Sequence, residues 1–225
     1  MANCLHLADA VLRGVDDDGA PGAARAADEY AQRLDDERIA LVKHLAERLP
    51  TEGTVVTVSA SSLVIDALKS APRLRVLCAV SDPGGEGRDA ADALEQAGLE
   101  TALIPDGALA QQSMRADAVV FGADALGPVA LLNKTGTLAA ALGARTARRP
   151  CLAVAATTKL VGERLWPQLT DASERLLTDG VPIFEEVPLS LVTTVVLETG
   201  PQTPRAIRRL SRSVRLHPRV VEWLG

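Results

Sequence analysis

The sequence predicts an α/β fold in which a parallel β-sheet is covered by helices on both faces and preceded by a short N-terminal helical segment. Short apolar runs alternate with segments of helical spacing from residue 54 onward, as in chains that build a parallel sheet. The runs 74–80 (LRVLCAV) and 151–156 (CLAVAA) are apolar almost throughout, which is typical of strands buried on both faces. A chain of 225 residues is long enough for one large domain with its own core.

The N-terminal helical segment is predicted over residues 1–50. Within it, residues 16–22 (DDDGAPG) form a loop rich in turn formers. Residues 24–49 form one long predicted helix, because apolar side chains recur there mostly at steps of three or four residues. Pro50 and Gly53 are expected to end this helix.

The main domain is predicted over residues 51–204. Its expected strands span residues 54–58, 74–80, 99–104, 118–121 and 151–155. Its expected helices span residues 63–69, 89–97, 108–114 and 134–147. Because strands and helices alternate along the chain, we expect parallel strands joined by crossover helices.

A basic tail occupies residues 205–225, and the spacing of its arginines predicts a helix. The stretch 201–225 has a net charge of +5, which leaves −10 for the other 200 residues. This asymmetry suits an acidic partner, although the preferred interpretation is a helix that lies on the protein's own acidic surface. Since the tail follows the main domain, we expect it to be dispensable for folding of the sheet.

Composition excludes several classes of protein. No apolar run approaches the ~20 residues that span a bilayer, and the first residues lack the charged start of a signal peptide, so a cytoplasmic location is expected. The cysteines Cys4, Cys78 and Cys151 are too few and too widely spaced for a disulfide framework or a zinc site, and no metal is predicted. Aromatic residues make up 2% of the chain, which gives no signal for nucleic-acid binding by base stacking.

Ligands of parallel sheets bind beyond the carboxyl ends of the strands, near a switch in strand order. The loops that this rule selects are 59–62, 81–88, 106–107, 122–124 with 133–134, and 156–159. They contain hydroxyl groups, Asp, Lys and Arg. Helix N-termini with basic side chains bind anions, and carboxylates accept hydrogen bonds from hydroxyls, so the loops suggest a phosphorylated polyol. No dinucleotide fingerprint or Walker loop is present, and no cofactor is predicted.

Three blocks in the second half of the chain are spaced as in a known family. They are residues 116–124 (ADAVVFGAD), 132–137 (LNKTGT) and 150–157 (PCLAVAAT). They resemble the family that contains the alpha, beta and delta subunits of initiation factor 2B, methylthioribose-1-phosphate isomerase and ribose-1,5-bisphosphate isomerase. A closing segment, 184–189 with 198–200, is also similar. The resemblance implies a Rossmann-like sheet domain and a homodimer, for which the apolar stretch 183–196 offers a surface.

The resemblance also selects site residues. The family's isomerases use a cysteine after the first strand and an aspartate in the block that ends at Asp124, and Ser59 stands at the place of the cysteine. Asp124 and Ser59 are therefore the candidate catalytic residues. The candidate ligand-binding residues are Ser61, Ser62, Arg88, Asn133 and Lys134.

Each of these residues also has a structural interpretation. Ser59 would cap the following helix, Asp124 would cap a turn at the end of its strand, and Arg88 would be a solvated charge. Lys134 would contact either a phosphate or the Asp124 carboxylate. The small residues at positions 60–62 favour an anion-binding nest at the start of the helix.

These observations favour an initiation-factor-2B-like protein that binds a phosphorylated sugar or nucleotide and has lost isomerase chemistry. The pKa of a cysteine thiol is about 8.5 and is readily lowered by its surroundings, so the thiol can lose its proton near neutral pH. The Ser59 hydroxyl loses its proton only to a neighbouring base. One alternative is an aldose–ketose isomerase that acts on a sugar 1-phosphate, with Asp124 as acid or base and Ser59 assisting. Another is a regulatory assembly subunit whose main partner is a protein.

Overall fold

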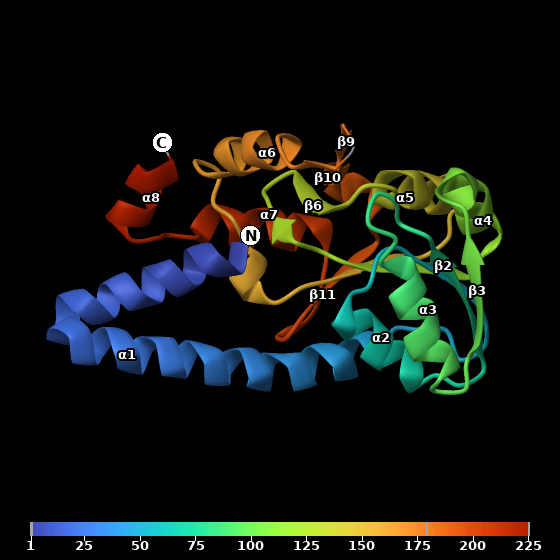
Figure 1. Ribbon diagram of the computed structural model, residues 1–225, viewed down its shortest axis with the longest axis horizontal. Coiled ribbons are helices and arrows are strands. Elements are labelled where there is room, and N and C mark those ends of the chain that lie inside the picture. The colour runs from blue at the N-terminus through green and yellow to red at the C-terminus, as the bar shows by residue number, and fades with distance from the viewer. Residues whose placement is uncertain (1, 179, 225) are drawn as a thin grey trace.

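A seven-stranded sheet forms the centre of the molecule (Figure 1). The computed structural model describes residues 2–178 and 180–224. In the order β12-β11-β7-β4-β1-β2-β3, the strands span Gly200–Gln202, Thr194–Leu197, Cys151–Val154, Ala118–Gly122, Gly53–Thr57, Leu74–Ala79 and Glu100–Ile104. Every neighbouring pair is parallel except β11 and β12. The predicted Rossmann-like α/β architecture is confirmed, and the five predicted strands lie within one or two residues of those observed.

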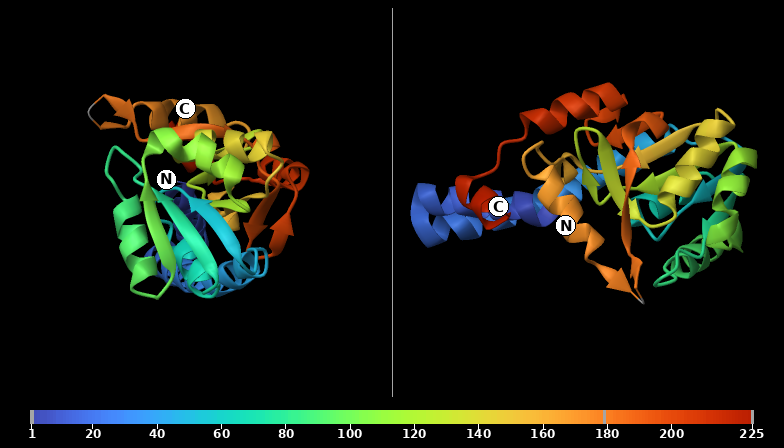
Figure 2. Two further views of the ribbon diagram at one scale, coloured as in Figure 1. Left: turned by 90° about the vertical axis from the view of Figure 1, so that its right-hand side faces the viewer. Right: turned by 90° about the horizontal axis from the view of Figure 1, so that it is seen from above.

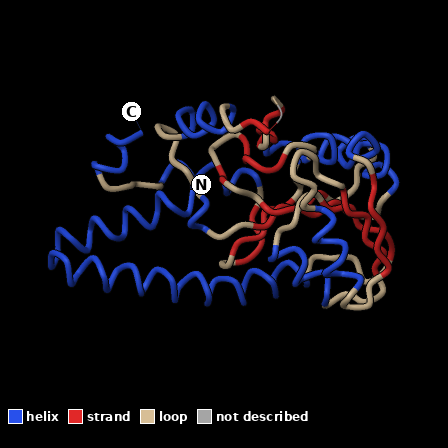
Figure 3. Tube along the Cα trace, viewed as in Figure 1, coloured by secondary structure: helices blue, strands red, loops and turns tan. Residues whose placement is uncertain are grey.

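Helices cover both faces of this sheet (Figures 1 and 3). The C-terminal half of α1 (Ala2–Ala46), α2 (Ser62–Lys69) and α3 (Gly87–Glu95) cover one face, and α4 (Leu109–Arg115), α5 (Thr137–Thr146) and α7 (Pro204–Ser213) cover the other. Successive side chains of a strand point to opposite faces, so Val55 packs in the first core and Val56 in the second. Both are fully buried, which explains why the strands are apolar throughout.

Helix α1 folds back on itself and projects from the body as a hairpin of two arms (Figure 2). The bend lies at Asp18 and Gly19, where Gly19 has a φ of 60°, a left-handed conformation that glycine adopts without a steric penalty. The arms approach so closely that a Cβ atom on Gly14 or Gly22 would collide with the backbone of the other glycine. The loop predicted at 16–22 is therefore a much shorter turn, and helix continues on both sides of it.

A small antiparallel sheet, absent from the sequence-based prediction, packs beside the main one. It contains β5 (Ala125–Leu126), β6 (Ala130–Lys134) and β10 (Phe184–Pro188), and α6 (Trp166–Glu174) covers it. Strands β8 (Leu177–Thr178) and β9 (Val181–Pro182) form a separate hairpin, and short 3-10 turns lie at η1 (Asp106–Ala108), η2 (Thr157–Lys159) and η3 (Leu189–Leu191). The predicted helix 134–147 thus begins only at residue 137, because the preceding residues pair with β10.

The basic tail is part of the folded body, which argues against the expectation that it is dispensable for folding of the sheet. Ile207 of α7 is fully buried in the same core as α4 and α5, and the Ser211 hydroxyl donates to the carbonyl of Leu126 at 3.1 Å. Helix α8 (Pro218–Leu224) is held against α1, where the His217 ring contacts Asp16 at 2.9 Å.

The arginines of the tail face solvent rather than an acidic surface. Arg205, Arg208 and Arg209 are exposed. Among the described residues, the ion pair that α7 makes with the body joins Arg212 to Glu163 at 3.3 Å. The preferred interpretation of the tail, a helix lying on the protein's own acidic surface, therefore fails for most of its charges, because the apolar side of α7 is the side that packs.

Within the described residues, no helix is long and apolar enough to cross a membrane.

Replacing Ile207 with alanine should lower the free energy of unfolding by about 2–5 kcal/mol, because it leaves a cavity in a fully buried position. Urea titration followed by circular dichroism measures the change. Arg208→Ala, on the exposed side of the same helix, is the control and should change stability by less than about 0.5 kcal/mol. Equal stability of the two variants would mean that α7 does not contribute to the core.

Candidate functional site

A cavity of about 450 Å³ opens at the carboxyl ends of β1, β4 and β7. Strand β1 lies between β2 and β4, so the connections on its two sides leave in opposite directions and the strand order switches there. The loops after these strands form the wall of the cavity, and Leu34, Asp35 and Arg38 of α1 cover one side of it. Of the candidate residues, the cavity brings together Ser59, Ser61, Ser62, Asp124 and Asn133.

Ser59 is held at the wall by a chain of hydrogen bonds. Its backbone N–H donates to the Ser81 hydroxyl at 2.8 Å, and the Asp106 carboxylate accepts from the backbone N–H groups of Ser81 and Asp82, both at 2.8 Å. Ser59 and Ser81 have φ values of 64° and 66°, a left-handed conformation that is strained for residues other than glycine. Such strained residues are found most often at functional sites. Ser59 is not a helix cap, since Ser61 occupies that position in α2.

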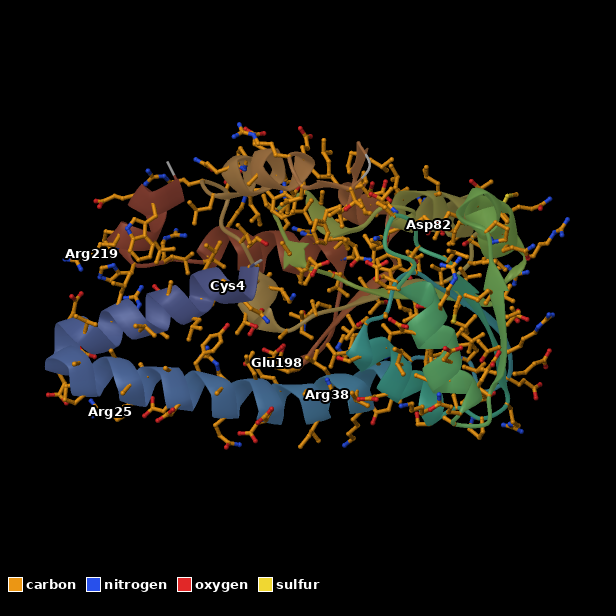
Figure 4. All side chains as sticks on the ribbon, viewed as in Figure 1. Cys4, Arg25, Arg38, Asp82, Glu198 and Arg219 are labelled. Atoms are coloured by element: carbon orange, nitrogen blue, oxygen red, sulfur yellow. The ribbon has the colours of Figure 1, made fainter. Side chains whose placement is uncertain are left out.

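The N-terminus of α2 faces the cavity through Ser61 and Ser62. Ser61 makes no side-chain cap, and its hydroxyl packs against Gly122, where an added Cβ would lie 2.8 Å away. The Arg38 guanidinium of α1 lies over this helix end (Figure 4) and donates to the Ser62 hydroxyl at 3.0 Å. It also pairs with Asp66. Backbone amides, two hydroxyls and a guanidinium therefore meet at one end of the cavity, an arrangement that binds anions.

Asp124 and Lys159 also line the cavity and form an ion pair. The Lys159 Nζ lies 3.6 Å from the Asp124 Oδ1, beyond hydrogen-bond distance, and the side chains are 20% and 34% exposed. The turn itself is held by the backbone N–H of Asp124, which donates to Leu132 at 2.8 Å. The carboxylate is thus available to the cavity.

Asn133 lies at the back of the cavity and is 5% exposed. Its amide donates to the Thr137 hydroxyl at 2.9 Å. Glu185 of β10 accepts hydrogen bonds from the backbone N–H groups of Gly136 and Leu138 at 2.7 and 2.8 Å and so fixes the turn that follows Asn133. Burial raises the pKa of Glu185 above its ordinary value, although these hydrogen bonds oppose the shift.

Lys134 and Arg88 do not line this cavity, which corrects their grouping with the other candidates. Lys134 is the next residue of β6 after Asn133, so its side chain points to the opposite face. It is 4% exposed, and its Nζ donates to Glu86 at 2.9 Å and to the carbonyl of Pro83. Arg88 is exposed in the first turn of α3. Lys134 therefore holds the loop that follows β2, and Arg88 lies at the start of the helix after this loop.

The structure adds residues that sequence reasoning ranked low or missed. From the sequence, Lys159 is a weaker candidate than the residues named above. Asn3, Asp35 and Arg38 reach the cavity from α1, and the residue spacing in that helix indicates which side chains are apolar but not which polar ones reach a ligand. Glu198 accepts from the backbone N–H of Thr157 at 2.9 Å and from its hydroxyl at 2.5 Å, and thereby positions the turn that carries Lys159. The resemblance of residues 198–200 to the family's closing segment was the available signal for Glu198.

No cysteine among the described residues lines the cavity. Cys78 and Cys151 are buried in the sheet, and burial raises the pKa of each thiol to about 12. Cys4 is exposed on α1 (Figure 4). Two histidine rings near the sheet contact backbone carbonyls instead, His6 that of Leu160 at 2.7 Å and His44 that of Leu197 at 3.2 Å.

Comparison with known proteins supports the resemblance. The Initiation factor 2 subunit family matches residues 7–204. A ribose 1,5-bisphosphate isomerase of Archaeoglobus fulgidus is 31% identical over 176 residues, 70% of this chain and 56% of the relative. The enzyme of the same name from Haloferax volcanii is 27% identical, over 84% of this chain and 64% of its own. The chain thus spans less than two thirds of the length of these relatives.

Solved structures of similar fold include translation initiation factor eIF-2B of Pyrococcus horikoshii, with a TM-score of 0.77 and 23% identity over 92% of this chain and 77% of the other. For 5-methylthioribose 1-phosphate isomerase of the same organism the TM-score is 0.66, with 22% identity, 89% of this chain and 66% of the other. The tetrameric eIF2B-beta2-delta2 complex from Chaetomium thermophilum contains a chain with a TM-score of 0.68 and 21% identity, over 89% of this chain and 70% of the other. At these identities the likeness concerns the fold.

The Glu185→Gln variant should gain stability relative to the unaltered protein as the pH rises. Because burial raises the pKa of Glu185 in the folded state, its ionisation weakens the fold as the pH rises from about 4.3, the unfolded value, through the folded value. Glutamine keeps an oxygen for the amides of Gly136 and Leu138 and has no charge to bury. Urea unfolding at pH 4 and pH 8 should show a difference between variant and parent that grows with pH.

The exposed Glu222 supplies the control for this experiment. Glu222→Gln removes the same charge without affecting a buried carboxylate, so its stability should follow the parent at both pH values. A Glu185→Gln variant that is less stable than the parent at pH 8 would contradict this prediction. It would show that the hydrogen bonds of the charged carboxylate stabilise the fold by more than its burial destabilises it.

Proposed function

Since the chain belongs to the Initiation factor 2 subunit family, we propose that it binds a phosphorylated sugar or nucleotide in the cavity at the carboxyl ends of β1, β4 and β7. The observation that carries this proposal is the placement of cationic groups and a helix N-terminus around a cavity that also holds a carboxylate. These groups come from four separate parts of the chain. Each has a chemical match in a sugar phosphate.

The phosphate is proposed to lie at the N-terminus of α2. The amides of its first turn carry a partial positive charge, and Arg38, which also pairs with Asp66, brings a guanidinium group beside Ser62. Lys159, whose ammonium is not hydrogen-bonded to Asp124 at 3.6 Å, keeps donors for a second anionic or hydroxyl group. Asp124 accepts hydrogen bonds from sugar hydroxyls, and the Asn133 side chain supplies a further polar group at the back of the cavity.

Isomerase chemistry is proposed to be lost or much reduced. Moving a proton between two carbons of a sugar requires a group that is deprotonated near neutral pH. Asp124 is the carboxylate at the position that the family's isomerases use, and Asp35 of α1 also lines the cavity. Ser59 stands where a thiol would stand in the isomerases that the sequence resembles. The thiol that pairs with the aspartate in those isomerases is therefore missing from this cavity.

An aldose–ketose isomerase that acts on a sugar 1-phosphate is the second candidate function. It is favoured by the common exposure of Ser59 and Asp124 to one cavity and by the name of the curated relatives, ribose 1,5-bisphosphate isomerase. In this case Asp124 would act as acid or base, and Ser59 would assist through a hydrogen bond.

We also propose that the protein assembles as a homodimer. A further alternative to the ligand-binding function is that the protein is a regulatory assembly subunit whose main partner is a protein. A similar chain comes from a tetrameric complex, which supports assembly in proteins of this fold. The apolar stretch 183–196 is not the expected surface, because Val187, Val195 and Val196 are fully buried in this chain. Leu177 and Val181 of the β8–β9 hairpin, 53% and 44% exposed, offer an apolar surface instead.

Light scattering at micromolar concentration should give twice the chain mass of 23.6 kDa. Leu177→Ser should shift the equilibrium toward single chains, because it removes apolar area from the proposed contact. Leu103→Ser, at another exposed apolar position, should leave the mass unchanged. A particle of single-chain mass for the unaltered protein would contradict the dimer.

Sugar phosphates or nucleotides should raise the melting temperature, because they bind only the folded state. A ligand at 100 times its Kd stabilises by about 2.7 kcal/mol, which corresponds to roughly 5–10 °C for a chain of this size. Lys159→Ala and Asp124→Asn should abolish the shift, and Lys43→Ala, which removes an exposed charge on α1, should not. A panel of phosphate esters that never shifts the unaltered protein would refute the binding site.

Turnover of ribose 1,5-bisphosphate and methylthioribose 1-phosphate should be weak or absent in the unaltered protein. Ser59→Cys should raise any residual rate, since general acid–base catalysis typically contributes about 10²–10⁴-fold and a thiol can supply the missing base. A coupled assay of product formation measures both rates. Robust turnover with Ser59 in place would favour the isomerase over the binding protein.

A further inference from the structure

A second cavity, of about 460 Å³, lies at the opposite edge of the sheet from the proposed ligand site. It is lined by Arg145, Thr146, Arg148, Arg149, Leu191 and Thr193. Strands β7 and β11 begin at Cys151 and Thr194, so this cavity adjoins their amino ends. The two cavities have no lining residue in common.

Three guanidinium groups share this cavity, and no carboxylate of the described residues lines it. The nearest acidic partner is Asp117, whose Oδ1 lies 3.8 Å from Arg149 Nη1. That distance exceeds a hydrogen bond, and the other oxygen of Asp117 accepts from the backbone N–H of Thr54 at 2.9 Å. The cavity therefore carries more positive charge than its surroundings neutralise.

The C-terminus of α5 accounts for only part of this charge. Basic side chains are favourable at a helix C-terminus, where the helix dipole amounts to roughly half a negative charge. Three arginines exceed that by a wide margin, so an anion in the cavity still meets a net positive field. Helix capping would be satisfied by one of them.

Arg148 also occupies a backbone position that glycine would fill at lower cost. It follows Ala147, the C-cap of α5, and has a φ of 56°, while the next backbone N–H, that of Arg149, donates to Ala144 at 2.8 Å. This left-handed position after a helix is usually glycine, because a Cβ atom there is sterically unfavourable. Folding alone therefore does not explain the arginine.

We propose that Arg145, Arg148 and Arg149 form a binding site for a small phosphate-bearing molecule, separate from the cavity at the carboxyl ends of the strands. Guanidinium groups match the geometry of phosphate oxygens and bind them in pairs of parallel hydrogen bonds. Three of them suit a ligand with two linked phosphates better than a single one. The site is a half-open hollow of about 460 Å³, a volume that suits a small molecule.

Isothermal titration with pyrophosphate tests the site in an Arg38→Ala, Lys159→Ala background, which removes both cations that line the other cavity. Pyrophosphate should still bind, and adding Arg148→Gly should weaken it about tenfold, because charge-assisted hydrogen bonds are lost. The same substitution should raise the melting temperature, since glycine relieves the left-handed backbone. Arg208→Ala, an exposed arginine on α7, should change neither quantity.

A merely structural arginine gives a different pattern. Arg148→Gly would then raise the melting temperature and leave pyrophosphate affinity unchanged, which would overturn the proposal. Absence of binding in the Arg38→Ala, Lys159→Ala background would overturn it as well, by assigning all anion binding to the first cavity. Parallel titrations with inorganic phosphate and ADP distinguish the source of the phosphate group, and a loss on Arg148→Gly with any of the three supports the site.

Discussion

Burial of the central strands on both faces is the constraint on which the rest of the structure depends. Val55 and Val56 follow each other in β1 and enter opposite cores, so neither face of the sheet can be left to solvent without exposing apolar side chains. Helices must then cover both faces. Because crossover connections are right-handed, those on one face run along the sheet in the opposite direction to those on the other face. The point between β1 and β4 where they diverge is the point at which the main cavity opens.

Small side chains make this two-sided packing possible in a chain with few aromatic residues. The core side of α5 consists largely of alanine, with Ala140, Ala141 and Ala144 fully buried. Gly143 packs against the backbone of α4, where an added Cβ would collide with the carbonyl of Ala110. Close helix contacts replace the volume that larger side chains would fill. The cavity wall also depends on a small residue, because a Cβ atom on Gly122 would collide with the Ser61 side chain.

Polar groups around the cavity divide into those that face it and those that hold its loops. Asp106, Glu185 and Glu198 accept hydrogen bonds from backbone amides at the carboxyl edge of the sheet or beside it. Their positions are therefore structural, although they lie close to the proposed ligand. Burial, together with the charge of Glu198, raises the pKa of Glu37 on α1, so the packing of α1 on this edge also brings carboxylates close together. Lys134 belongs to the loop-holding group through its pair with Glu86.

Local pattern in the sequence determined the class of fold, the five parallel strands that precede residue 156 and the grouping of Ser59, Asp124 and Asn133. It did so because apolar periodicity is a property of neighbouring residues, and because carboxyl ends of parallel strands meet at one edge. Only the tertiary structure decided that Arg38 of α1 reaches that edge and that Lys134 points away from it. The same holds for the packing of Ile207 and for the meeting of Arg145, Arg148 and Arg149 with Thr193. Such contacts depend on the docking of helices and the pairing of distant strands, and the spacing of side chains along a single segment carries no record of either.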